Sequence, residues 1–117
     1  MINSNYTVEK LIKTLRKCKP HQVIFINDDI YGHMQTSITM ESSMDLSYKY
    51  AVINFTTNKK TNTVHSALCI LSKFPKNMQV LMASTQFLAE ENFQIIKYED
   101  ILEVSLKLEN EKDFIEV

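Results

Sequence analysis

The sequence predicts an α+β domain in which a mainly antiparallel sheet carries two helices on one face. Two observations support this prediction. Apolar residues recur at helical spacing in two segments that resemble each other, and short apolar runs of strand length follow each segment. The 117 residues fit a single domain, residues 1–117, and the 44% hydrophobic and 23% charged residues are typical of a globular chain.

The first helix is expected to begin at Thr7, whose hydroxyl can accept a hydrogen bond from a first-turn amide, and to end near Pro20. Its apolar stripe steps by +3, +1, +3 and +3 along the chain, which describes one face of a helix. The stripe consists of Val8, Leu11, Ile12, Leu15 and Cys18.

A second helix repeats this pattern 56 residues later (63 minus 7), beginning at Thr63 and ending near Pro75. Its stripe has the same steps and consists of Val64, Ala67, Leu68, Leu71 and Phe74. A Gln-Val pair opens the strand after each helix, at 22–23 and at 79–80, so the comparison places a one-residue insertion in the second copy. We interpret the chain as two related helix-strand units.

Apolar and alternating runs predict six strands, which gives the order α-β-β-β-α-β-β-β. The strands are expected at 22–26, 33–40, 50–55, 79–83, 93–97 and 102–108. The first unit then spans residues 7–55, the second spans 63–108, and 109–117 form an acidic tail. A two-fold pseudo-symmetric pair of half-sheets is the alternative arrangement.

Several chemistries are disfavoured by composition. Phosphate-binding loops and dinucleotide turns need several glycines, and Gly32 is the only glycine in the chain. No serine lies in a nucleophile-elbow sequence. Cys18 is expected in the core and Cys69 at the surface, and two cysteines do not make a disulfide framework. We therefore predict a protein that is not an enzyme and has no cofactor.

Three histidines and two neighbouring aspartates form the one plausible metal or acid–base set. It comprises His21, His33, His65, Asp28 and Asp29. His33 could meet either aspartate across a turn, but aspartates in turns usually bind their own backbone, and no zinc-ligand spacing is present. The sequence predicts no metal site and no catalytic residue.

Three surfaces are candidates for binding a partner. The first helix has a basic face formed by Lys10, Lys13, Arg16 and Lys17. The second helix is apolar on more than one side, through Ile70, Cys69 and His65, which indicates either a contact surface or a deeply buried helix. The tail ends in Phe114, Ile115 and Val117.

Charge is divided unevenly along the chain. Residues 1–60 carry eight basic and five acidic residues, and residues 61–117 carry five basic and nine acidic residues. Opposite net charges can favour self-association, so a homo-oligomer is possible, although ordinary solvated faces explain the same division. Neither half is basic enough to indicate nucleic acid by charge alone.

The order α-β-β-β-α, with Lys59 and Lys60 just before the second helix, is similar to that of double-stranded-RNA-binding domains. This resemblance implies duplex RNA as a partner, contacted by the two lysines and the basic first helix. The chain lacks the family's further lysine, its alanine-rich second helix and its loop glycines. Nucleic acid is therefore the alternative partner.

The segments Thr7-Val8-Glu9-Lys10-Leu11-Ile12-Lys13-Thr14-Leu15 and Gln22-Val23-Ile24-Phe25-Ile26-Asn27-Asp28 resemble small phage and mobile-element proteins. The resemblance covers residues 7–32, with an echo at 63–84. It implies a non-catalytic accessory protein that binds and inhibits or modulates a host protein, including defence proteins, in the host cytoplasm. No apolar run reaches the roughly 18–20 residues of a membrane span, and the N-terminus lacks a secretion-signal pattern, so a cytoplasmic protein is expected.

Overall fold

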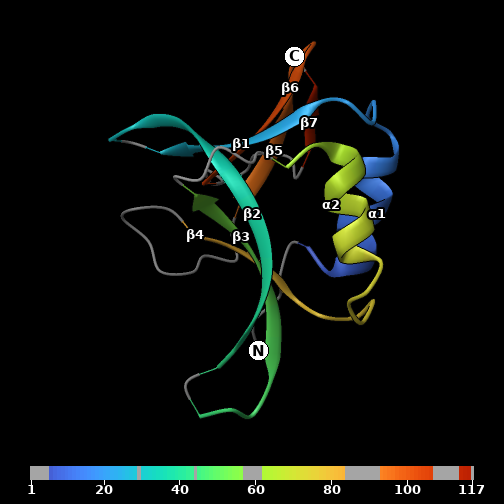
Figure 1. Ribbon diagram of the computed structural model, residues 1–117, viewed down its shortest axis with the longest axis vertical. Coiled ribbons are helices and arrows are strands. Elements are labelled where there is room, and N and C mark those ends of the chain that lie inside the picture. The colour runs from blue at the N-terminus through green and yellow to red at the C-terminus, as the bar shows by residue number, and fades with distance from the viewer. Residues whose placement is uncertain are drawn as a thin grey trace.

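The computed structural model describes residues 6–28, 30–43, 45–56, 62–83, 93–106 and 114–116. The elements in chain order are α1 (Val8–Arg16), β1 (Val23–Asp28), β2 (Gly32–Ser42), β3 (Lys49–Thr56), α2 (Val64–Leu71), β4 (Val80–Ala83), β5 (Phe93–Lys97), β6 (Ile101–Leu106) and β7 (Phe114–Glu116). The α+β class is confirmed, and β7 lies in the segment expected to be a tail. Figure 1 shows the two helices side by side on one side of a curled sheet.

Both helices begin after the predicted threonine caps. The Thr7 hydroxyl accepts a hydrogen bond from the Lys10 amide at 3.2 Å, and the Thr63 hydroxyl accepts one from the Ser66 amide at 3.2 Å. In α2 the Ser66 hydroxyl also accepts a bond from the Thr63 amide, which completes a capping box. The caps satisfy amides that have no partner within the helix.

The next unpaired amides of α1 are satisfied by the second unit. The Val8 amide donates to the Met78 carbonyl at 2.8 Å, and the Glu9 amide donates to the Lys76 carbonyl at 2.9 Å. These carbonyls belong to the loop between α2 and β4. The start of α1 is therefore fixed on the loop that follows the other helix.

The start of α2 is fixed on the first unit in the same way. The Val64 amide donates to the Gln22 carbonyl at 2.8 Å, and the His65 amide donates to the Pro20 carbonyl at 2.9 Å. Each donor and each acceptor lies 56 residues from its counterpart in the other set (8 and 64, 22 and 78). The two helix–loop junctions thus exchange hydrogen bonds reciprocally.

The hydrogen bonds at the starts of β1 and β4 are also related by an offset of 56 residues. The Ile24 amide donates to the Asn62 carbonyl at 2.9 Å, and the Val80 amide donates to the Tyr6 carbonyl at 3.0 Å. Residue 24 therefore corresponds to residue 80, again 56 positions later. The one-residue insertion inferred from the Gln-Val pairs is wrong, because hydrogen bonding aligns the junctions without a gap.

The sheet is mixed, and the expectation of a mainly antiparallel sheet is only partly met. The strand order is β4-β3-β2-β1-β6-β5-β7. Within the described residues, β1–β2, β2–β3 and β5–β6 pair antiparallel, whereas β1–β6, β3–β4 and β5–β7 pair parallel. The parallel pair β3–β4 arises because α2 forms the crossover between these strands, and such a crossover returns the chain in the same direction.

The core lies between the helices and the sheet. Val8, Leu11 and Leu15 of α1 are buried, as are Val64, Ala67 and Leu71 of α2, so most of each predicted stripe faces the sheet. Cys18 is also buried, as expected, and Cys69 is exposed. Neither helix of the described ranges combines the length and the apolar character that a membrane span requires.

A buried glutamine links the two units. The Gln22 side chain is fully buried; its oxygen accepts a hydrogen bond from the Lys19 amide, and its nitrogen donates to the Tyr98 and Glu99 carbonyls at 3.1 Å. These carbonyls lie in the turn between β5 and β6, next to the parallel pair β1–β6. The amide therefore satisfies backbone groups in both units, as burial of polar atoms requires.

We predict that Thr63→Ala lowers the free energy of unfolding by about 1 kcal/mol, because it removes the hydroxyl that caps α2. Urea denaturation monitored by circular dichroism measures the change. Thr63→Ser keeps the hydroxyl and serves as the matched control, with a much smaller loss. Equal stability of wild type and both variants would contradict the role of the cap.

Candidate protein-binding surfaces

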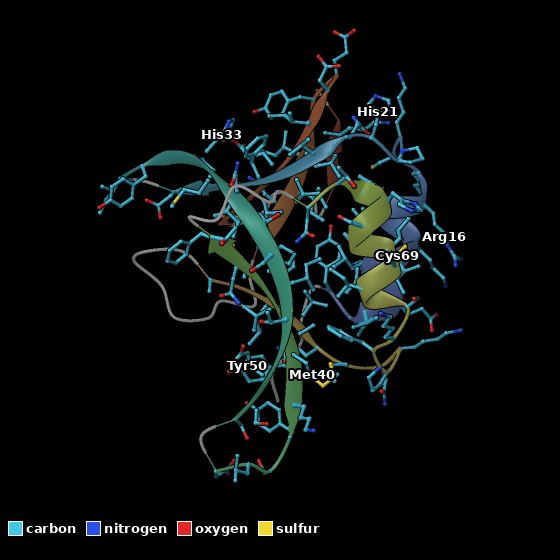
Figure 2. All side chains as sticks on the ribbon, viewed as in Figure 1. Arg16, His21, His33, Met40, Tyr50 and Cys69 are labelled. Atoms are coloured by element: carbon cyan, nitrogen blue, oxygen red, sulfur yellow. The ribbon has the colours of Figure 1, made fainter. Side chains whose placement is uncertain are left out.

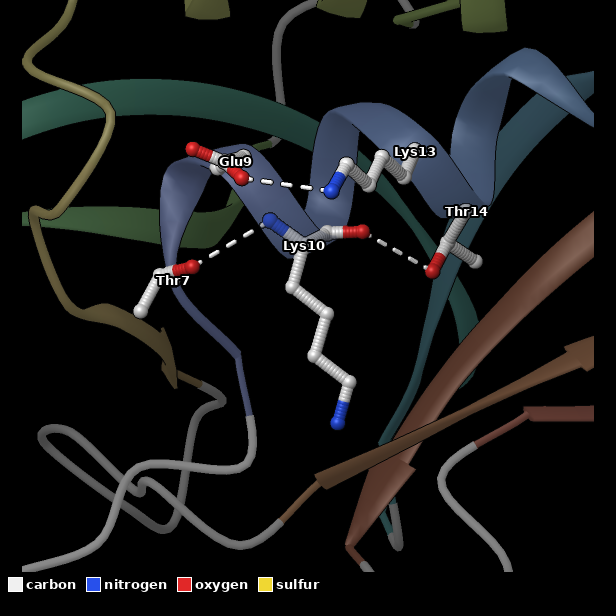
Figure 3. Close-up of polar contacts among 5 residues, drawn as sticks. All are labelled: Thr7, Glu9, Lys10, Lys13 and Thr14. Carbon is white, nitrogen blue, oxygen red and sulfur yellow. Dashed lines mark hydrogen bonds and ion pairs between the residues drawn. The ribbon is translucent and has the colours of Figure 1, made fainter.

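The basic face of α1 is exposed, as the sequence predicts. Lys10, Lys13, Arg16 and Lys17 all lie at the surface. Lys13 Nζ lies 3.2 Å from a Glu9 carboxylate oxygen, and Lys10 Nζ lies 5.0 Å from the centre of the buried Tyr6 ring. Figure 3 shows the Glu9–Lys13 pair beside the Thr7 cap. Two of the four cations are thus already engaged, which reduces the positive potential this face offers to phosphate groups.

The predicted surface on α2 is divided by the structure. His65 and Cys69 are exposed and in contact, with 3.7 Å between His65 Nε2 and Cys69 Sγ. Ile70 is half-buried and packs against the core. The second apolar side of α2 therefore contributes to the interior of the protein, and the outward face carries the polar pair.

The end of the chain contributes a strand. The backbone of Phe114 pairs with Ile95, and that of Ile115 with Ile96, so β7 extends the sheet parallel to β5. Residues 109–113 and 117 of the predicted tail lie outside the described residues. Phe114 and Ile115 are therefore positioned by a strand pairing that the sequence did not predict.

The histidine and aspartate set is not brought together as one site. His21 and His33 lie near opposite ends of β1 (Figure 2). The Asp28 carboxylate accepts hydrogen bonds from the Ile30 and Tyr31 amides, both at 3.0 Å, which is the turn role expected of it. Asp29 lies outside the described residues.

His33 instead meets a carboxylate that sequence reasoning missed. Its Nε2 atom lies 2.5 Å from Glu103 Oε1, and its ring stacks on Phe25 with the ring centres 5.7 Å apart. Glu103 is almost fully buried. It is 70 residues from His33 in sequence, and only the parallel pairing of β1 with β6 brings it near. No spacing rule could therefore have found this pair.

A shallow depression adjoins this pair. It is lined by His33, Tyr98, Glu99, Asp100 and Ile101. Across the described ranges, no three His, Cys, Asp or Glu side chains are grouped closely enough to hold a metal ion. The histidine–carboxylate pair joins β2 to β6 across the intervening strand β1, and the geometry identifies no reaction for it.

The tip of the hairpin formed by β2 and β3 is a surface that the sequence did not indicate. The two strands pair from Gln35–Thr56 to Ser42–Lys49. The neighbouring pairings end earlier: β1 pairs with β2 only over 32–35, and β4 pairs with β3 only over 51–54. Figure 1 shows the far part of the hairpin extending away from the helices and the rest of the sheet.

Large apolar side chains are exposed on this hairpin. Leu46 is 78% exposed, Tyr48 is 55% exposed and Met40 is 39% exposed. The Tyr48 and Tyr50 rings lie 6.0 Å apart, between centres, in a tilted arrangement. Figure 2 shows Met40 and Tyr50 on different sides of the strands. Apolar groups are thus presented on both faces of the projecting hairpin.

Asp45 accepts several hydrogen bonds from residues on either side of it in the connection between β2 and β3. One of its carboxylate oxygens accepts hydrogen bonds from the Ser43 hydroxyl at 2.8 Å, the Ser47 hydroxyl at 2.7 Å and the Ser47 amide at 3.0 Å. The backbone adds bonds from Leu46 N to Ser43 O and from Ser43 N to Tyr48 O, both at 2.9 Å. These bonds favour the charged carboxylate and lower the pKa of Asp45 from 3.8 to about 2.

Leu46 has an unusual backbone conformation. Its φ is 61°, in the left-handed region, and it is the one non-glycine residue with positive φ in the described part of the chain. This conformation costs a residue with a Cβ atom roughly 1–2 kcal/mol. Because the Leu46 side chain is largely exposed, packing within the protein does not offset that cost.

Comparisons with known proteins give no relative for this chain: no family model, no curated protein and no solved structure matches it.

We predict that the Asp45 carboxyl titrates with a pKa of about 2, and that Ser47→Ala raises this pKa toward 3.8, because the largest stabilising hydrogen bond is lost. A carbon-detected NMR titration of the side chain measures both values. Since the folded pKa lies below the unfolded one, the carboxylate stabilises the fold above the unfolded pKa. This contribution is lost as the pH falls toward 2. An Asp45 pKa near 3.8 in the wild type would contradict the loop hydrogen bonds.

Proposed function

We propose that the chain is a non-catalytic protein-binding module that contacts its partner through the tip of the β2–β3 hairpin. The observation that carries the proposal is Leu46, a leucine in a strained conformation whose side chain is 78% exposed. Strained residues that folding does not require are concentrated at functional sites, where the strain presents a group to a ligand. The Leu46 amide donates to the Ser43 carbonyl, but its side chain points largely into solvent.

The hairpin has the properties of a binding surface beyond this residue. Tyrosines are favoured as anchors at protein interfaces because they combine a large apolar ring with a polar hydroxyl and few rotatable bonds. The Asp45 hydrogen bonds restrain Ser43 and Ser47, so less entropy is lost on binding. A partner with an apolar pocket is the chemistry that fits Leu46 and Tyr48.

The biological part of the proposal rests on the sequence. The resemblance to small phage and mobile-element proteins supports a host protein as partner, whose activity the chain would block by occupying its surface. A projecting hairpin suits this role, because it can enter a groove or cleft that a flat surface cannot reach. The exposed basic face of α1 and the outward face of α2 are further candidate surfaces.

We predict that Leu46→Asn stabilises the fold by up to about 1 kcal/mol, because asparagine adopts the left-handed conformation at lower cost than leucine. Thermal or urea denaturation measures the change. Tyr48→Ser, in the same loop but without the strained backbone, is the control and should not stabilise. A destabilised Leu46→Asn protein would show that the leucine side chain supports the fold.

We predict that Leu46→Asn and Tyr48→Ser each abolish capture of the partner from an extract of cells in which the gene naturally occurs. Mass spectrometry of material bound to the tagged protein measures capture. Tyr31→Ser is a matched control, because Tyr31 is 66% exposed but lies in the turn between β1 and β2. Wild-type capture by the hairpin variants would overturn the assignment of the surface.

Binding of duplex RNA to the full chain tests the alternative partner. Lys59 and Lys60 lie outside the described residues, so this reading depends on the α1 basic face. Binding through phosphate contacts weakens steeply as salt rises and is lost when Arg16 and Lys17 are changed to alanine. Docking of the hairpin tip depends weakly on salt. Salt-sensitive RNA binding that survives the hairpin substitutions would favour the RNA-binding function.

A further inference from the structure

The outward face of α2 carries two metal-binding side chains that touch each other. His65 and Cys69 are four residues apart, so they lie one above the other on the helix. Both are exposed, and His65 Nε2 lies 3.7 Å from Cys69 Sγ. Figure 2 shows Cys69 on the side of α2 turned away from the sheet. This pair lies on α2, separate from the tip of the β2–β3 hairpin.

The distance within the pair matches the requirement of a tetrahedral zinc site. With Zn–S of about 2.3 Å and Zn–N of about 2.0–2.1 Å, a tetrahedral angle places the two ligand atoms about 3.6 Å apart. The observed separation is 3.7 Å. A zinc ion can therefore bind both atoms with little movement of either side chain. Thiolate and imidazole are also the ligands that zinc prefers in structural sites.

One chain supplies only half of such a site. Structural zinc takes four protein ligands, and the described residues contain no third His, Cys, Asp or Glu beside this pair. A two-fold axis through the metal doubles the pair to two cysteines and two histidines. The short Ser72 side chain lies one turn beyond Cys69, is exposed, and turns back on its own helix by donating to the Cys69 carbonyl at 2.7 Å.

We propose that His65 and Cys69 of two copies of this chain bind one Zn²⁺ and join the copies through their α2 helices. Binding converts each Cys69 thiol to a thiolate, so one Zn²⁺ displaces two protons into solvent. Each His65 binds as the neutral imidazole. The two thiolates balance the charge of the metal, and the site carries no net charge. Affinity falls at low pH, because protons compete for both ligand types.

The test uses the full chain, with Zn²⁺ and Co²⁺ as probes. Addition of one Zn²⁺ per two chains should double the molar mass measured by light scattering, relative to protein in EDTA, and excess EDTA should restore the original value. Co²⁺ should give the charge-transfer absorption of a thiolate complex with the same stoichiometry. A 1:1 complex without a change of mass would overturn the proposal, as would unchanged mass with no absorption.

Matched variants assign the ligands. Cys69→Ser and His65→Gln should each weaken Zn²⁺ binding at least about tenfold and abolish the doubling of mass, while circular dichroism confirms that they fold. Cys18→Ser and His21→Gln should keep both properties, because Cys18 is buried and His21 lies outside the pair. Tyr48→Ser should also form the dimer. A thiolate absorption that persists in Cys69→Ser would contradict the site.

Discussion

The reciprocal exchange of backbone hydrogen bonds between the two units is the constraint on which the rest of the structure depends. In each helix the first two amides donate to carbonyls that follow the other helix, and the third donates to a threonine cap. A helix has four such unpaired amides, and leaving them buried without partners is costly. The first amides of each helix therefore depend on carbonyls of the other unit, which ties together residues far apart in sequence.

This near-symmetric arrangement makes the differences between the units informative. The hairpin β2–β3 of the first unit corresponds in place to the hairpin β5–β6 of the second. The last strand of each hairpin pairs parallel with the first strand of the other unit, β3 with β4 and β6 with β1. The second hairpin closes with the short turn from Lys97 to Ile101, whereas the first extends to a loop at Ser43–Tyr48. The extension is not required by the shared architecture, and it carries the exposed apolar groups.

Local physics explains what the sequence could predict. Threonine caps and apolar steps depend on neighbours within one or two turns, so both helices and the approximate strands followed from the sequence. The parallel pairing of β1 with β6 and the His33–Glu103 contact depend on partners 78 (101 minus 23) and 70 residues away, for which no local pattern exists. The Gln-Val repeat misled the alignment, because buried Gln22 corresponds to Met78 and not to Gln79. The sequence did not indicate the hairpin tip as a binding surface, because a leucine is not a residue from which a positive φ is predicted.

Two described residues have positive φ, and they differ in what their side chains contribute. Gly32 has a φ of 73° at the start of β2, directly after the turn from β1, and a Cβ there would meet no atom within 4 Å, so glycine is favoured by backbone conformation alone. Leu46 adopts nearly the same conformation, with a φ of 61°, where glycine or asparagine would cost less. The single glycine of the chain therefore stands at a position that requires only a positive φ. At the hairpin tip it keeps a large apolar side chain despite the strain, which is the arrangement expected where that side chain must reach another molecule.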